Sequence, residues 1–235
     1  MFGARTSSLA LVVGMVALAA CGSSGGGTKK VDAATDLATA TAAVVNGADL
    51  PGYASSPHTN SDDPPSSITQ DFATCVNLPT TIFDTTPGAQ KVNSADFTQE
   101  QTQTEISGDV VIYPAQSDAD AAWTSISKSG IESCFQQLFE EAVKVGLTES
   151  EGITFGPTAV DRFDPGIGDR SIGYAVKITA AGPSSSGIFF SDFIFVARDR
   201  AAMELDFVQS GSALDRGFET SLAQKVYDRI GDKAK

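Results

Sequence analysis

The sequence predicts an α+β fold, in which an antiparallel meander sheet of about five strands carries helices packed on one face. Three observations lead to this class. Four strand-like segments follow one another between residues 153 and 207, and short turns join them. Short turns force antiparallel pairing, because parallel strands need a long crossover connection. Helical periodicity before and after this series supplies the elements that would cover the sheet.

The strands are predicted from β-branched and aromatic residues that alternate with small or polar ones. Between residues 171 and 179 this alternation has a period of two, which is typical of a strand with one face in water. Residues 188–197 are apolar on both faces, which favours a central place in the sheet. In the last strand Met203, Leu205 and Phe207 alternate with Ala202, Glu204 and Asp206. The expected strands are residues 105–113, 153–163, 171–179, 188–197 and 202–207.

The clearest helix is predicted over residues 131–145, where apolar residues repeat at three- and four-residue steps. Cys134 lies on its apolar stripe, and Gly146 is a plausible left-handed cap. A preceding helix is expected from about Asp118, because Ser117 and Asp120 resemble a capping box.

Two further helices are expected at the ends of the folded region. Residues 32–45 have a weakly amphipathic pattern that stops near Asn46-Gly47. At the end of the chain, apolar residues spaced by four form the buried stripe of a last helix. They are Leu214, Phe218, Leu222, Val226 and Ile230.

The N-terminus has the form of a bacterial lipoprotein signal peptide. A short basic start precedes an apolar run over residues 9–20, and small residues stand just before Cys21. The run is too short for a membrane span, which needs about 20 residues, and an ordinary secretory signal requires no cysteine at the cut. We expect residues 1–20 to be removed, and Cys21 to carry acyl chains such as palmitate and so to anchor the chain in the cell membrane. Residues 21–31 would be a flexible tether on the extracytoplasmic side, and residues 32–235 a single domain.

The charge of the chain excludes some classes of partner. Loss of residues 1–20 removes Arg5 and no acidic residue, which leaves 15 basic and 29 acidic residues and a net charge of −14. A nucleic-acid-binding protein needs a basic surface that displaces counterions. We therefore expect no nucleic-acid partner and no polybasic membrane-binding face.

Two cysteines remain after Cys21, and outside the cytoplasm Cys75 and Cys134 are expected to form a disulfide. Closing a loop of about 59 residues would stabilise the fold by about 4 kcal/mol in the chain-entropy model. The alternative is a pair of free buried thiols. His58 is the single histidine, so a zinc site built on these cysteines is not expected.

The sequence contains no constellation of residues that indicates an enzyme, and we expect no catalytic residue and no cofactor. His58 stands in a polar segment, where a solvated loop histidine is far commoner than a general base. No nucleophile elbow, zinc-protease motif or phosphate-binding loop occurs.

Three aspartates between residues 161 and 169 have a spacing that resembles a calcium loop. The segment lacks the alternating ligands and the terminal glutamate of an EF-hand. We therefore expect no metal, and predict that Asp164-Pro165-Gly166 is a turn between two strands. Arg162 and Arg170 would partly compensate the acidic charges.

Aromatic residues on the predicted strands are candidates for an apolar ligand site. Their side chains must divide between the two faces of the sheet, and a plain core is the commoner role for such residues. The same comparison applies to Trp123 on a predicted helix. The candidate ligand-facing residues are Phe189, Phe193, Phe195, Phe207 and Trp123.

Several short motifs resemble those of actinobacterial cell-envelope lipoproteins. They are Phe-x-x-Cys at residues 72–75, Val-Val-Ile-Tyr at 110–113, Gly-Asp-x-Ser at 168–171 and Phe-Val-Ala-Arg at 195–198. Over roughly residues 46–232 the arrangement resembles the extracellular sensor domain of mycobacterial receptor kinases of the PknH type. The resemblance implies an antiparallel sheet flanked by helices around a ligand-binding cleft. That family's sensor domain carries two disulfides and belongs to a kinase, whereas this chain can form one and has no kinase domain, so a signalling role is not implied.

The sequence therefore favours a non-catalytic, membrane-anchored lipoprotein with a sensor-like domain that binds a small or lipidic envelope molecule. The alternative is a protein-interaction or assembly factor of the cell envelope that has no small-molecule ligand. A hydrolase is the third and weakest hypothesis. It would need a serine or cysteine within hydrogen-bond reach of a base in a cleft.

Overall fold

The computed structural model describes residues 32–58, 74–75, 86–147, 154–181 and 186–235. The predicted signal peptide, Cys21 and the whole of the predicted tether lie outside these residues. The helices are α1 (Ala33–Ala43), α3 (Gln116–Ile126), α4 (Ile131–Leu147), α5 (Arg216–Ile230) and the 3-10 helix η3 (Gly231–Ala234). The strands are β1 (Ala54–Ser56), β2 (Gln90–Asn93), β3 (Asp96–Gln99), β4 (Thr104–Ile112), β5 (Thr154–Phe155), β6 (Ala159–Phe163), β7 (Ser171–Ala181), β8 (Ser186–Arg198) and β9 (Ala201–Ser210).

The predicted α+β class is confirmed, and the antiparallel sheet is larger than expected. It has nine strands, ordered β1-β3-β4-β9-β8-β7-β5, with β2 also paired to β4 and β6 to β7. Strands β7, β8 and β9 form the expected meander. The added strands are short, and β2 and β3 are mostly polar, so the pairing with β4 decides their conformation. The predicted strand over residues 153–163 is divided into β5 and β6.

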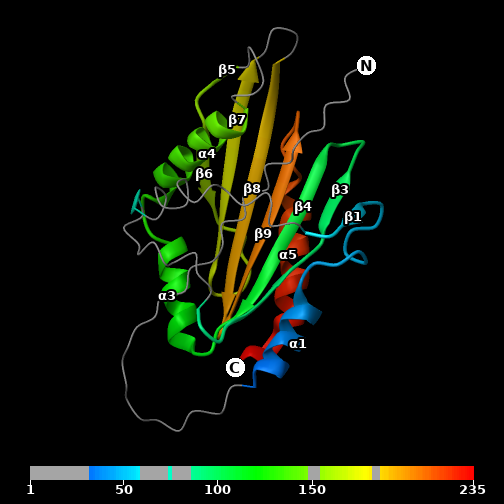
Figure 1. Ribbon diagram of the computed structural model, residues 1–235, viewed down its shortest axis with the longest axis vertical. Helices are drawn as coiled ribbons and strands as arrows, with labels where there is room; N and C mark the ends of the chain where they lie inside the picture. Colours follow the sequence, from blue (N-terminus) through cyan, green and yellow to red (C-terminus); the bar gives the residue numbers. More distant parts are fainter. Residues whose placement is uncertain (1–31, 59–73, 76–85, 148–153, 182–185) are drawn as a thin grey trace.

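Helices cover both faces of the sheet, so the prediction that they lie on one face was wrong (Figure 1). Met203, Leu205 and Phe207 of β9 pack in a core with α1 and α5. On β8, Phe193 and Phe195 pack on the opposite face against α4. Because β8 and β9 are buried on both sides, each side needs its own helical layer.

Helix α4 follows the predicted amphipathic pattern. Phe135 and Phe139 are buried, with ring centroids 5.9 and 5.7 Å from that of Phe193. The helix continues through Gly146 to Leu147, so Gly146 is not its cap. Cys134, on the same stripe, forms the predicted disulfide with Cys75, with their Cα atoms 5.7 Å apart.

Helix α3 begins earlier than the capping-box interpretation predicts. Its N-cap is Ala115, which makes no side-chain cap hydrogen bond. Asp120 accepts hydrogen bonds from Gln116 within the helix and from Arg170, which precedes β7. The carboxylate that was expected to cap the helix therefore ties it to the sheet.

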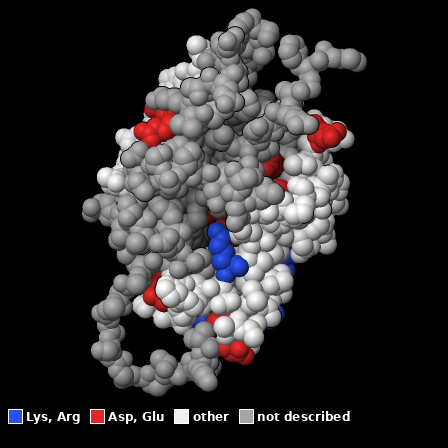
Figure 2. Space-filling model, in the orientation of Figure 1, with Lys and Arg blue, Asp and Glu red and all other residues white. Residues whose placement is uncertain are grey.

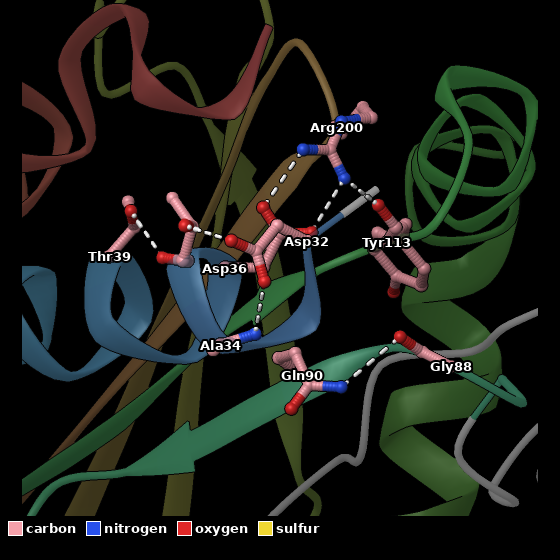
Figure 3. A network of polar contacts seen from close by, with 9 residues as sticks. Asp32, Ala34, Asp36, Thr39, Gly88, Gln90, Tyr113 and Arg200 are labelled. Atoms are coloured by element: carbon pink, nitrogen blue, oxygen red, sulfur yellow. Dashed lines mark hydrogen bonds and ion pairs between the residues drawn. The ribbon is translucent and has the colours of Figure 1, made fainter. Parts of the chain in front are cut away.

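Arg200, in the turn between β8 and β9, connects both ends of the described chain. Its guanidinium donates to both carboxylate oxygens of Asp36 in α1 at 2.9 Å, and to the carbonyl of Tyr113 (Figure 3). Its backbone N–H donates to the carbonyl of Ala234 in η3. Two parallel bonds to one carboxylate fix the orientation as well as the distance.

No helix in the described residues is long and apolar enough to cross a membrane.

Loss of the disulfide should cost much of the stability of the domain. The bridge joins cysteines 59 residues apart, which corresponds to about 4 kcal/mol of unfolded-state entropy. We expect Cys134→Ser to lower the free energy of unfolding by several kcal/mol, as measured by guanidinium denaturation. A reductant should destabilise the wild type and leave a Cys75→Ser/Cys134→Ser variant unchanged. Equal unfolding midpoints for wild type and variant would contradict a structural role for the bridge.

Candidate functional site

A pocket of about 660 Å³ lies at the edge of the sheet, where β7 ends, β8 begins and the short strand β5 pairs with β7. Its wall contains Phe155, Ile188 and two alanines, with threonine hydroxyls and glycine backbone beside them. Gly156 N–H donates to the carbonyl of Thr179, which closes the bend after β5. The lining residues are Thr154, Phe155, Gly156, Thr179, Ala180, Ala181, Gly187, Ile188 and Gly211.

The aromatic residues proposed from the sequence as ligand contacts do not line this pocket. Phe193 and Phe195 are fully buried between β8 and α4. Phe207 is buried on the opposite face, 6.5 Å from Phe218 between ring centroids. Trp123 packs at the border of the α4 core. Phe189 is 38 % exposed, and it is not among the residues that line the pocket.

A second feature, which sequence analysis missed, is a buried group of carboxyls on the α3/α4 side of the sheet. The strand register sets Asp109 of β4 opposite Glu204 of β9, with Asp206 two residues further along the same face. These three residues, here called the acidic cluster, are 3, 1 and 4 % exposed respectively. Lys91 of β2 donates to Asp109 over 2.8 Å. Figure 2 views this side of the molecule and shows basic atoms near its centre with acidic atoms close by.

The electrostatics of the acidic cluster follow from burial. Removal from water, together with repulsion between the neighbouring carboxylates, raises the pKa of Glu204 and of Asp206 well above their usual values, and the ammonium of Lys91 opposes both shifts. Burial also raises the pKa of Tyr113, and the charges of Asp109 and Glu204 add to this increase.

The alternating pattern of residues 202–207 explains why sequence analysis missed the burial of these acids, and the neighbouring strand indicates how it could have been predicted. Glu204 and Asp206 alternate with Met203 and Leu205, which suggests a strand with one polar face. The neighbouring strand, residues 188–197, is apolar on both faces. A partner of such a strand is covered on both sides too, so polar residues on either face become buried.

A third polar group lies on the α1/α5 side of the sheet. Arg216 at the start of α5 bridges Asp192 of β8, at 3.2 Å, and Glu219, at 2.7 Å. Its guanidinium carbon also stands 3.5 Å from the ring centroid of Phe163. That ring in turn covers Gly173, where an added Cβ would lie 2.0 Å from it. The Phe163 ring thus packs against the Arg216 guanidinium, which lies between the carboxyls of Asp192 and Glu219.

Glu219 is fully buried, and burial together with the neighbouring Asp192 raises its pKa to about 8, against the opposing charge of Arg216. Burial also raises the pKa of Asp192. Among the described residues, Glu219 Oε1 has no hydrogen-bond partner. This carboxyl therefore takes up a proton on folding at neutral pH.

His58 is not the solvated loop residue that the sequence predicts. Its Nδ1 lies 2.7 Å from Oδ1 of Asp96, and the imidazole is 10 % exposed. Pairing of β1 with β3 sets Ser56 opposite Asp96 and so brings the histidine to it. Within the described parts of the chain, no serine or cysteine hydrogen-bonds to this imidazole.

The turn predicted at Asp164-Pro165-Gly166 is confirmed, because Asp164 Oδ1 accepts a hydrogen bond from Gly166 N–H at 2.8 Å. The expected charge compensation is not found. Arg170 pairs with Asp120 of α3, and Arg162 donates to the carbonyl of Ser127. Among the described residues, no group of three or more histidine, cysteine or acidic side chains is placed to hold a metal ion.

Comparison with solved structures finds the extracellular domain of PknH from Mycobacterium tuberculosis. It shows 13 % identity and a TM-score of 0.41, over 87 % of this chain and 98 % of that one. A putative regulator of unknown function from Pseudomonas aeruginosa, PA94, shows 10 % identity and a TM-score of 0.19, over 52 % and 67 % of the chains. No family model and no curated protein matches the sequence. Similarity of this extent assigns neither a ligand nor an activity.

The raised pKa of Glu219 predicts that stability falls as the pH rises. Between the unfolded value near 4.5 and about 8 the native state binds more protons than the unfolded state, so ionisation opposes folding throughout that interval. We expect the free energy of unfolding to drop by a few kcal/mol from pH 5 to pH 8, at about 1.4 kcal/mol per unit of pKa difference.

Chemical denaturation at a series of pH values measures this slope. Glu219→Gln should make it less steep, while Glu204 and Asp206, whose pKa values are also raised, keep their own contribution. The exposed Glu100 provides the control, since Glu100→Gln should keep the wild-type slope. A Glu219→Gln variant with an unchanged slope would show that Glu219 is ionised in the native state.

Proposed function

We propose that this chain is a non-catalytic binding protein, held at the outer side of the cell membrane by acylated Cys21. Its ligand is a small apolar or lipidic molecule that enters the pocket between the ends of β5, β7 and β8. The tether of residues 21–31 places the domain close to the bilayer from which such a molecule would come.

The edge pocket is the observation that carries this proposal. Its volume of about 660 Å³ lies within the range of about 300–1,000 Å³ that small-molecule sites occupy. Phe155, Ile188, Ala180 and Ala181 supply apolar surface, while Thr154 and Thr179 supply hydroxyls to orient a polar end. Among the described residues that line the pocket, no side chain is charged and none is a histidine, which suits binding rather than catalysis.

The disulfide and the charge support an extracytoplasmic location. Disulfides persist in oxidising compartments and are rare in the cytoplasm. The Cys75–Cys134 bridge fixes α4 from its buried side. An acidic surface also keeps a protein from adhering to anionic lipid, so that an acyl chain must supply the attachment.

The pocket is tested with a fluorescent fatty-acid analogue, dansylaminoundecanoic acid, whose emission rises in an apolar site. Gly187 lines the pocket, and a Cβ added to it meets only Phe189 Cε2, at 3.9 Å. A larger side chain there has room to occupy the pocket. We expect Gly187→Phe to weaken probe binding about tenfold or more, equivalent to about 1.4 kcal/mol. Gly187→Ala, the matched control, should bind as the wild type does, and equal affinity of the Phe and Ala variants would contradict this site.

The anchor is tested separately by expression in a bacterium that acylates lipoproteins. Wild type should incorporate radiolabelled palmitate and sediment with membranes, whereas Cys21→Ala should do neither, because the thiol is the acylated atom. A Cys75→Ser/Cys134→Ser variant controls for thiol loss and should retain the label. Unlabelled wild type would overturn the anchoring proposal while leaving the pocket proposal intact.

A further inference from the structure

Helix α5 does not cover the edge pocket, because it begins further along the sheet. Arg216, at the start of the helix, pairs with Asp192 of β8, so residues 186–190 of that strand extend past the helix (Figure 1). Ile188 in this stretch lines the pocket and is only partly buried. None of the described residues that line the pocket belongs to a helix. In the described part of the chain, this end of the sheet face is therefore open to a bound molecule.

Lys177 of β7 lies on the same face of the sheet as two side chains of the pocket wall. Its sequence neighbours Val176 and Ile178 pack in the α4 core, and successive residues of a strand point to opposite faces. Lys177 and Thr179 therefore both point away from α4. Thr179 is paired in register with Ile188, and directly paired residues share a face. The lysine thus stands two residues, or about 7 Å, along the strand from the pocket wall.

Phe190 spans the distance between the pocket wall and this lysine. It is paired in register with Lys177 and follows Ile188 by two residues, so all three share one face. Phe190 is partly buried, whereas Lys177 is exposed. The methylene stem of a lysine commonly rests on apolar surface while its ammonium stays in water. An apolar chain that leaves the pocket across Ile188 and Phe190 therefore ends at a positive charge.

The positive charge of Lys177 has no partner within the described part of the chain. Asp161 of β6 and Asp192 of β8 lie on the same face, two positions further along the strands. Asp192 pairs with Arg216, and neither aspartate lies within ion-pair distance of Lys177. The chain has 16 basic and 29 acidic residues, so an unpaired lysine beside an uncharged pocket wall is a specific place for an anion.

We propose that the edge pocket takes a single-chain carboxylate amphiphile, with its apolar chain in the pocket and its carboxylate on the ammonium of Lys177. The inference rests on the pocket of the proposed function and names the head group of its ligand. One ammonium acts as a point charge and matches one carboxylate. A phosphate group carries more charge and is favoured by the planar fork of an arginine.

The two parts of this site have different roles. Burial of the apolar chain supplies most of the affinity, since each methylene removed from water contributes about 0.8 kcal/mol. An ion pair at an exposed lysine adds little to affinity. Lys177 therefore selects the head group, and its removal should affect charged ligands alone.

The experiment compares dansylaminoundecanoic acid with its primary amide, which has the same chain and fluorophore but no charge. Binding is measured at pH 7 to the Cys21→Ala protein, so that acyl chains on the protein itself do not compete for the pocket. We expect wild-type Lys177 to favour the acid over the amide about fivefold. Lys177→Gln should weaken binding of the acid by this factor and leave binding of the amide unchanged. Lys177→Glu should weaken binding of the acid about tenfold or more, because it adds repulsion.

The matched control is Lys233→Gln, which removes the same charge from an exposed lysine of η3. This residue precedes Ala234, whose carbonyl meets Arg200 at the opposite end of β8 from the pocket. The control should keep the wild-type preference for the acid. An equal loss in Lys233→Gln and Lys177→Gln would show an effect of net charge and would overturn the proposal.

Failure of this inference can be distinguished from failure of the pocket itself. If acid and amide bind wild type equally while Gly187→Phe weakens both, the pocket stands and the head-group assignment is overturned. A preference for the acid that persists in Lys177→Gln overturns it as well. If neither probe binds the wild type, the pocket proposal and this inference fall together.

Discussion

The architecture depends on β9 being buried on both of its faces. Its backbone pairs with β4 on one side and β8 on the other, and Met203, Leu205 and Phe207 fill the core beneath α1 and α5. The other face meets the layer of α3 and α4, and it carries Ala202, Glu204 and Asp206. A strand enclosed in this way cannot turn its polar side chains to water. The acidic cluster is thus a direct consequence of where the chain places its last strand.

The sequence was informative where one local pattern sufficed. Helix α4, the β7–β8–β9 meander and the stripe of Leu222, Val226 and Ile230 on α5 were all predictable, because the periodicity of their apolar residues decides their conformation. Strands β2 and β3 could not be predicted, because they are short and mostly polar. Such segments become strands here only because they pair with β4. The start of α3 was misplaced since packing and the Arg170–Asp120 pair, rather than a capping side chain, fix that helix.

The candidate sites were less accessible to sequence reasoning than the fold. The edge pocket is lined from four separate stretches of chain, mostly by glycine, alanine and threonine, whose residue types indicate no ligand on their own. The predicted aromatic contacts proved to be mainly core, because Phe193 and Phe195 alternate onto the α4 side and Phe207 onto the other. His58 gained its carboxylate partner from a strand almost forty residues away, and no local spacing announces such a contact.

Arg200 has one more consequence, which concerns the two ends of the folded region. Asp36 near the first described residue and Ala234 at the last helical one are both held by this arginine, the first by its side chain and the second by its main chain. Neither end can fray without disturbing the grip on the other. The two ends of the domain therefore lie close to each other. A short peptide that joins them would permit a circularly permuted chain.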